Sequence, residues 1–288
     1  MSKIPPNVEA YNPYASNKPE IDLIVTLGGD GTILHANSLF NTGPVPPVLS
    51  FSMGTLGFLL PFHINSLPTA LEDVFSGTAT ILPRMRLACT FHDADGKFII
   101  KDGAEGPLLA MNEVTLHRGG SPHLTRIDSY VDDAHLTEAV SDGLIVSTPT
   151  GSTAYSLSSG GPIVHPSVRA LIMTPICPRS LSFRPLVLPS SSDICMMVNK
   201  ESRAPAEVSM DGQSIINLQA GESVHVSTST FPMPCINRSS PACAPDADEA
   251  DGLPSGASQD NWVRDINNLL LFNVSFKSSA LVFGKEAA

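Results

Sequence analysis

The segment LGGDGTILHA, residues 27–36, places one carboxylate, Asp30, between glycines. The apolar run before it predicts a strand buried on both faces, and the pattern after it fits a helix that starts near Thr32. Glycines let a ligand approach the backbone, and the free N–H groups at a helix start favour phosphate. The turn therefore offers a phosphate cradle beside a carboxylate that can accept the proton of an attacking hydroxyl, as in phosphoryl transfer. The candidate phosphate-binding residues are Gly28, Gly29, Gly31 and Thr32.

A simpler interpretation of this turn is equally open on these residues alone. Asp30 would then only cap the helix, and the glycines would only make the turn. The segment matches neither the G-x-G-x-x-G fingerprint nor a Walker loop with its lysine.

A second polar segment, residues 142–166, reads DGLIVSTPTGSTAYSLSSGGPIVHP. It predicts a strand, a hydroxyl-rich turn and a short helix. The hydroxyls, the backbone N–H groups near Gly151 and the flat ring of Tyr155 suit a polar aromatic ligand with sugars and phosphates, such as a dinucleotide. The alternative is a capped turn with Tyr155 in the core. Upstream, the amide and carboxylate of Asn112 and Glu113 can bind a base edge or a ribose diol, although alone such a pair is ordinary surface polarity.

The charge and composition of the chain limit its partners. With 17 Lys and Arg against 28 Asp and Glu, the formal net charge is −11, which argues against general binding to nucleic acid or to an acidic membrane surface. No run approaches the ~20 apolar residues of a membrane span. The five scattered cysteines form no C-x-x-C pair and the start has no signal-peptide pattern, so we expect reduced thiols, no zinc site and a cytoplasmic location.

The pattern along the chain changes near Arg84. Residues 1–20 are expected to be a flexible lead-in, and residues 21–83 predict a β–α–β unit with a parallel sheet. Residues 84–258 contain short alternating segments, among them GKFIIKD, that predict a β-rich domain, with a mobile loop over 232–258. Residues 259–288 begin with an amphipathic helix. Its apolar face would contain Trp262, Val263, Ile266, Leu269 and Leu270.

Taken together, these segments resemble the NAD kinase family. The family pattern has a GGDG turn, an asparagine–glutamate pair and a T-x-T-G-S-T-A-Y loop, which stand here at 28–31, 112–113 and 148–155. The resemblance runs from about residue 20 to about 275, and MTPICPRSLSFRPLVLP and VSMDGQ resemble the eukaryotic, fungal-like branch. The GGDG turn is shared with lipid kinases and phosphofructokinases, whereas the threonine-rich loop is the specific part.

The resemblance implies ATP-dependent phosphorylation of the adenosine-ribose 2′-hydroxyl of NAD, with Mg²⁺ on the triphosphate and Asp30 as general base. It implies an α/β domain followed by a β-sandwich-like domain, with the final helix returning to the first domain, in a homo-oligomer. The residues that match dinucleotide-binding positions are Gly31, Phe58, Asn112, Glu113, Asp142, Thr150, Thr153, Ala154, Tyr155 and Ser158. Two anionic substrates need local positive charge, which we expect from Mg²⁺ and from Arg118, Arg126, Arg179 or Arg184.

Two departures from the family pattern bear on function. Only about 20 residues precede the first strand, where the family has further strands and helices, so the α/β domain is expected to be truncated or completed by another chain. Arg179 stands in PICPRS where histidine is usual. The alternatives to an active kinase are therefore a catalytically silent NAD- or NADP-binding subunit and, on the GGDG turn alone, a lipid kinase.

Overall fold

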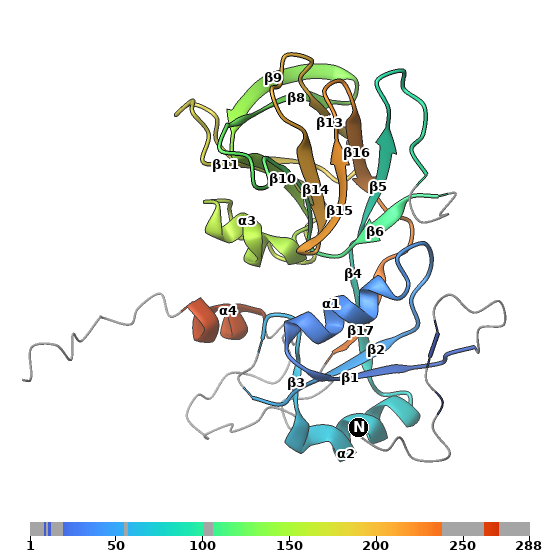
Figure 1. Ribbon diagram of the computed structural model, residues 1–288. Helices are drawn as coiled ribbons and strands as arrows, with labels where there is room; N and C mark the ends of the chain where they lie inside the picture. Colours follow the sequence, from blue (N-terminus) through green and yellow to red (C-terminus); the bar gives the residue numbers. More distant parts are fainter. Residues whose placement is uncertain are drawn as a thin grey trace, which may run out of the picture.

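The computed structural model describes residues 9, 11–12, 20–54, 57–100, 106–237 and 262–270. Figure 1 shows an α/β part, which contains the first strands and helices of the chain, beneath a sheet-rich part. Two fold predictions are confirmed by this arrangement: an α/β domain at the start and a β-sandwich-like domain after it.

The first part is built on a mixed sheet with the strand order β1-β2-β17-β4, in which β3 pairs with β2. β1 and β2 run parallel, with Ile24 opposite Val48 and Gly28 opposite Ser52, and helix α1 connects them. This is the β–α–β unit that the sequence predicts. The elements are β1 (Ile24–Gly28), α1 (Asp30–Ser38), β2 (Val48–Ser52), β3 (Phe62–His63), η1 (Ile64–Ser66), α2 (Leu67–Phe75), β4 (Thr80–Arg84) and β17 (Met233–Asn237).

Strand β17 corrects the predicted loop over residues 232–258. Residues 233–237 enter the first sheet, parallel to β2 and antiparallel to β4, and Met233, Cys235 and Ile236 are buried. The apolar side chains of this short stretch stand among prolines and polar residues, which hide the strand in the sequence pattern. The remainder of the predicted loop, from residue 238 on, lies outside the described residues, as does most of the predicted lead-in.

The second part is a sandwich of two sheets, with the orders β12-β11-β10-β7-β14-β15 and β6-β5-β16-β13-β8-β9. Strands such as β8 and β13 alternate buried and less buried residues, as expected where one face of a sheet packs on a core. The strands are β5 (Leu87–His92), β6 (Leu108–Ala110), β7 (Glu113–His117), β8 (Thr125–Val131), β9 (Ala134–Ser141), β10 (Gly143–Ser147), β11 (Ala170–Ile176), β12 (Leu186–Pro189), β13 (Ile194–Val198), β14 (Ala206–Met210), β15 (Gln213–Leu218) and β16 (Ser223–Thr228).

Two smaller predictions differ from the structure. In GKFIIKD, the described residues 96–100 contribute one β-bridge, between His92 and Phe98, because the segment turns directly back on β5.

Helix α4 (Trp262–Leu270) forms where expected, and Figure 1 draws it at the side of the first part. Its Ile266 is buried but Val263 is 69% exposed, so Val263 does not share the buried face. The Trp262 ring packs edge-on against His165.

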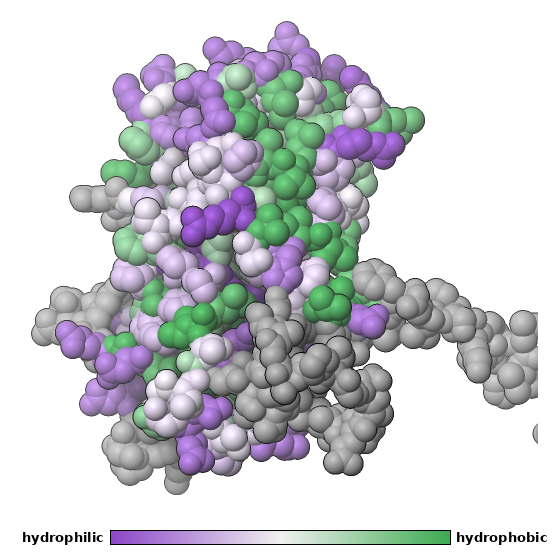
Figure 2. Space-filling model, turned by 180° about the vertical axis from the view of Figure 1, so that it is seen from behind, coloured by the Kyte–Doolittle hydropathy of each residue, from purple (hydrophilic) through white to green (hydrophobic). Residues whose placement is uncertain are grey.

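The surface is uneven in hydropathy. From behind, hydrophilic residues crowd the top of the sandwich, and a hydrophobic band runs down the molecule beside them (Figure 2). No helix in the described ranges is long and apolar enough to cross a bilayer.

Candidate functional site

The glycine turn lies at the carboxyl end of β1, where open parallel sheets bind their ligands. β1 ends at Gly28, Gly29 is the N-cap of α1, and Asp30 is the first helical residue. Gly29 and Gly31 are exposed, and a Cβ added to either would meet no atom within 4 Å. The backbone of the turn is therefore open to a ligand.

The Asp30 carboxylate is held by a different segment of the chain. Its Oδ2 accepts a hydrogen bond from the backbone N–H of Phe58 and its Oδ1 accepts one from Leu59, each at 3.1 Å. A Cβ on Gly57 would lie 2.2 Å from Oδ1, so only glycine permits this approach. Because Asp30 follows the N-cap and its carboxylate bonds residues 58 and 59, the helix-capping interpretation is wrong.

Burial changes the chemistry of this carboxylate. It raises the pKa of Asp30, while the N–H groups of Leu59 and Phe58 and the charge of Arg84 oppose the rise. An aspartate with a raised pKa is a better proton acceptor than a free one.

Arg84, at the end of β4, connects the glycine turn with the threonine-rich loop. It is only 9% exposed, its charge acts on Asp30, and its Nη1 donates to Thr150 Oγ1 at 3.3 Å. Its Nε is buried and has no hydrogen-bond partner among the described atoms. The guanidinium thus lies between the two motifs with donor capacity to spare.

The threonine-rich loop packs on the asparagine–glutamate pair. The Thr148 N–H donates to the Asn112 carbonyl at 2.9 Å, and Thr148 Oγ1 donates to the Met111 carbonyl at 2.7 Å. A Cβ on Gly151 would lie 2.0 Å from the Asn112 carbonyl oxygen, so the two segments touch through backbone. The loop forms a short 3-10 helix, η2 (Thr150–Thr153), followed by α3 (Tyr155–Ser158).

The side chains of Asn112 and Glu113 each have an oxygen atom that forms no hydrogen bond with a described residue. Both side chains are at least nine-tenths buried, and neither Asn112 Oδ1 nor Glu113 Oε2 has a hydrogen-bond partner. Burial, assisted by the charge of Asp211, raises the pKa of Glu113 to about 8, against a hydrogen bond from the Tyr155 backbone N–H. Buried polar atoms are normally paired, so these two point to a ligand.

Most of the other expected dinucleotide-binding residues are more exposed than this pair. Tyr155 is 44% exposed, which excludes a tyrosine in the core and leaves its ring free for contact. Asp142 lies before β10 and pairs with Arg118, whose Nε is 2.6 Å from Asp142 Oδ1. Thr153 and Ala154 are half-buried and Ser158 is exposed on α3. Phe58 contributes its backbone N–H to Asp30, as described above.

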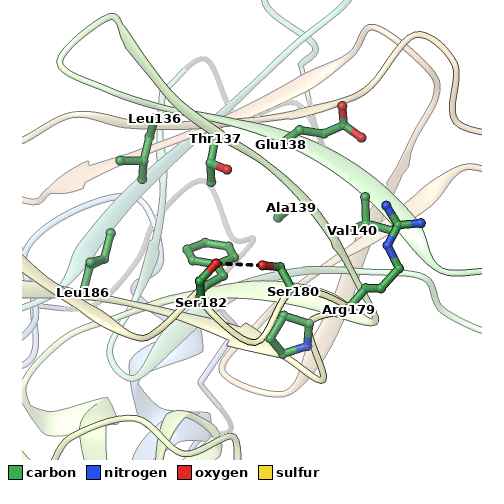
Figure 3. Close-up of a pocket in the computed structure, with 11 residues that line it drawn as sticks. Leu136, Thr137, Glu138, Ala139, Val140, Arg179, Ser180, Ser182 and Leu186 are labelled. Atoms are coloured by element: carbon green, nitrogen blue, oxygen red, sulfur yellow. Dashed lines mark hydrogen bonds between the residues drawn. The ribbon is translucent and has the colours of Figure 1, made fainter.

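The four arginines that were expected to supply positive charge near the substrates lie at different places in the structure. Arg118 is paired with Asp142, and Arg126, on β8, is paired with Glu138 of β9 and with Glu201, which follows β13. Arg179 stands at a hollow of about 280 Å³ beside β9, where its charge acts on Glu138 (Figure 3). No described contact joins Arg126, Arg179 or Arg184 to Asp30. The arginine beside Asp30 is Arg84, which the expected set omits.

The chain matches two family models. The boundary between the two matches lies near the boundary between the α/β part and the sheet-rich part of the fold. Residues 11–79 match the ATP-NAD kinase N-terminal domain and residues 111–238 match the ATP-NAD kinase C-terminal domain. The threonine-rich loop and the asparagine–glutamate pair lie within the second match, and Asp30 lies within the first. The lipid-kinase alternative therefore has no support.

Relatives with names and structures agree with these matches. The chain is 44% identical over 271 residues to a mitochondrial NADH kinase of Schizosaccharomyces pombe and 43% identical over 270 residues to one of Saccharomyces cerevisiae, covering 94% and 89% of this chain. It spans 64% of the length of each of these two relatives.

Solved structures show the same likeness in three dimensions. A crystal structure of yeast NADH kinase complexed with NADH is similar with a TM-score of 0.76 and 42% identity, over 90% of this chain and 68% of that one. An NAD kinase from Archaeoglobus fulgidus in complex with ATP is similar with a TM-score of 0.62 and 26% identity, over 75% and 78%. By sequence, by domain order and by fold, the chain belongs to the NAD kinase family.

Proposed function

We propose that this chain transfers the γ-phosphoryl group of ATP to the adenosine-ribose 2′-hydroxyl of NAD, which yields NADP and ADP. The observation that carries the proposal is the meeting of the two motifs at Arg84, which bonds Thr150 and acts on Asp30. A phosphate-binding turn and a nucleoside-binding loop at one place are what a kinase of a dinucleotide needs.

Asp30 is proposed as the general base. The ribose 2′-oxygen forms a bond to the γ-phosphorus as the bond from that phosphorus to the β,γ-bridging oxygen breaks, and ADP leaves. The hydroxyl proton passes to the Asp30 carboxylate. Burial favours this transfer because it raises the pKa of Asp30 above its usual value.

The exposed turn backbone at Gly29 and Gly31 is proposed to receive the phosphates, with the start of α1 behind it. The described residues include no group of three or more His, Cys, Asp or Glu arranged for a metal ion. This fits Mg²⁺ that arrives with ATP, because that ion is usually held by one or two carboxylates and the phosphates themselves. When bound, it would neutralise the charge of the triphosphate.

The dinucleotide is proposed to lie along Asn112, Glu113 and the start of α3. The unsatisfied oxygens Asn112 Oδ1 and Glu113 Oε2 would accept hydrogen bonds from ribose hydroxyls or the base. The half-exposed Tyr155 ring offers a stacking surface, and Asp142 lies at the rim with Arg118. Because two relatives are named NADH kinases, NADH is to be tested beside NAD.

The deciding experiment measures NADP or NADPH formation by the purified chain with NAD or NADH, ATP and Mg²⁺. Asp30→Asn should lower kcat by at least about 100-fold, while the Kd for NAD, measured by calorimetry, stays close to that of the parent. Asp128→Asn is the control, because its carboxylate bonds Asn199 on the outer face of the sandwich.

Two other results would contradict parts of this proposal. Normal turnover by Asp30→Asn contradicts the base assignment. Binding of NAD by a parent chain that makes no NADP contradicts the kinase proposal and favours the silent NAD-binding subunit. The cytoplasmic location and the homo-oligomeric state expected from the sequence stay predictions.

A further inference from the structure

A carboxylate outside the expected set of site residues, Asp211, accepts hydrogen bonds from the backbone of the asparagine–glutamate pair. Asp211 follows β14 and has a left-handed backbone conformation, with φ of 48°. Its backbone N–H donates to the Glu113 carbonyl at 3.0 Å. The turn is thus bent so that the Asp211 side chain faces the segment that enters β7.

Three successive backbone N–H groups converge on this one carboxylate. Met111 donates to Oδ2 at 2.8 Å, Asn112 donates to Oδ1 at 2.7 Å, and Glu113 donates to Oδ1 at 3.3 Å. Burial raises the pKa of Asp211, and these N–H groups oppose the rise because they favour the ionised carboxylate, to which hydrogen bonds are shorter and stronger than neutral ones. Asp211 therefore fixes the backbone of the pair directly, and the two orphaned side-chain oxygens are carried on that backbone.

The same carboxylate is connected to helix α1. Asn37 Nδ2 donates to Asp211 Oδ2 at 3.3 Å, and Asn37 Oδ1 accepts from Arg86 Nη1 at 3.2 Å. Asn37 and Arg86 are almost completely buried. Because α1 begins with Asp30, one rigid helix about 10 Å long separates Asp30 from the residue that contacts Asp211.

We propose that Asp211 is a positioning residue, which sets the Asn112–Glu113 pair against helix α1 so that the dinucleotide held by the pair presents its hydroxyl to Asp30. The proposal rests on the function proposed above. Its physical basis is that proximity effects decay quickly with misplacement, about 100-fold in rate for 1 Å. A carboxylate that ties both binding elements together is a means of keeping that distance.

The first test is Asp211→Asn, which keeps the shape but removes the charge and turns one acceptor into a donor. The Kd for NAD, measured by calorimetry, should rise at least about 10-fold, because the amide nitrogen confronts either a backbone N–H or the Asn37 amide. The Kd for ATP should stay within about twofold, since no described contact joins Asp211 to the glycine turn. Asp128→Asn is the matched control, because Asp128 also accepts from an asparagine amide, Asn199 Nδ2 at 2.8 Å.

A second readout reports on the backbone itself. Hydrogen exchange of the amides of residues 111–113 should accelerate in Asp211→Asn and remain unchanged in Asp128→Asn, because only the first variant weakens their acceptor. Parent-like NAD affinity in Asp211→Asn would overturn the proposal. Equal weakening of NAD and ATP binding with a lowered Tm would also overturn it, since that pattern shows a structural role alone.

The third test exchanges donor and acceptor between the partners. Asn37→Asp places a carboxylate against Asp211 and should weaken NAD binding, while the bond from Arg86 to position 37 can persist. In the double variant Asn37→Asp with Asp211→Asn, an amide again faces a carboxylate, and NAD affinity should recover at least about threefold over Asp211→Asn alone. No recovery would overturn the link to α1.

These tests remain separate from the test of the kinase proposal. Binding and hydrogen exchange need no turnover, so a parent chain that binds NAD but makes no NADP defeats the proposed reaction and leaves Asp211 to be judged on binding. If Asp211→Asn does not fold, Asn37→Asp carries the test alone, with parent-like NAD affinity as the contradicting result.

Discussion

Arg84 Nη1 donates a hydrogen bond to Thr150 Oγ1 at 3.3 Å, from a guanidinium whose charge also acts on Asp30. One buried cation therefore lies between the glycine turn and the threonine-rich loop. Arginine is favoured where phosphate is recognised, because it keeps its charge when buried and offers several donors. Its Nε is buried without a hydrogen-bond partner among the described residues.

Arg84→Met should reduce kcat by roughly 100-fold, the loss typical of removing one donor aimed at developing charge. The positive charge of Arg84 lowers the pKa of Asp30, so its removal should also move the acid limb of the pH profile to higher pH. Steady-state kinetics from pH 5.5 to 8.5 measures both effects. Arg126→Met is the control, because Arg126 pairs with Glu138 and Glu201 away from the turn. Unchanged kinetics in Arg84→Met would show that Arg84 is not part of the reacting centre.

Gly57→Ala should displace the Asp30 carboxylate. The added Cβ would lie 2.2 Å from Oδ1 and 2.7 Å from Cγ, distances that real Cβ atoms do not keep. We expect kcat to fall at least about 30-fold from this misplacement, with little change in the Kd for NAD. Gly54→Ala, in the same segment, is the matched control, since its Cβ would meet no atom within 4 Å. Equal activity of the two variants would contradict the geometry given for Asp30.

Arg86→Met should destabilise the protein. Arg86 is fully buried and donates to the carbonyl groups of Phe40, Gly43 and Phe231 as well as to Asn37. These acceptors lose their partner together, and the Asp211 charge loses a nearby cation. Breaking one side of a buried charged network costs roughly 3 kcal/mol. Urea unfolding measures the loss, and Arg126→Met, a half-exposed arginine, should show a much smaller one; equal losses would contradict the prediction.

The local parts of the site could be predicted from the sequence. A strand, glycines and a carboxylate in one short segment indicate the Asp30 turn, and apolar runs indicate the β–α–β unit. The threonine-rich loop likewise contains its own signal, because its hydroxyls and its tyrosine are close in sequence. These features depend on neighbours along the chain, which a pattern can show.

The missed residues depend on partners distant in the sequence. Arg84 meets Thr150, 66 residues away, and Asp211 meets Asn112, 99 residues away. No local pattern reports such pairs, although two arginines flanking Met85 at the entry to a buried strand are a signal that polar partners must lie nearby. β17 was missed for the same reason, because its strand character depends on β2 and β4.

The last prediction concerns the pH dependence of stability and begins with Glu113. Burial first, and the Asp211 charge second, raise the pKa of Glu113 to about 8 from an unfolded value near 4.5. The folded state therefore binds more protons than the unfolded state between these values. Stability contributed by the protonated carboxyl is fully present below about pH 4.5 and is lost as the pH rises through about 8.

Glu113→Gln should flatten this slope, because glutamine cannot titrate. Urea unfolding at pH 5.5, 6.5, 7.5 and 8.5 should show parent stability falling with pH by at most about 1.4 kcal/mol per unit for one proton, with a smaller fall in the variant. Glu201→Gln, an exposed glutamate, should keep the parent slope. Calorimetry of NAD binding in buffers of different ionisation enthalpy should detect proton release near pH 7, since ribose hydroxyls that donate to Glu113 favour its ionised form. Identical slopes in parent and Glu113→Gln would show that Glu113 does not hold a proton at neutral pH.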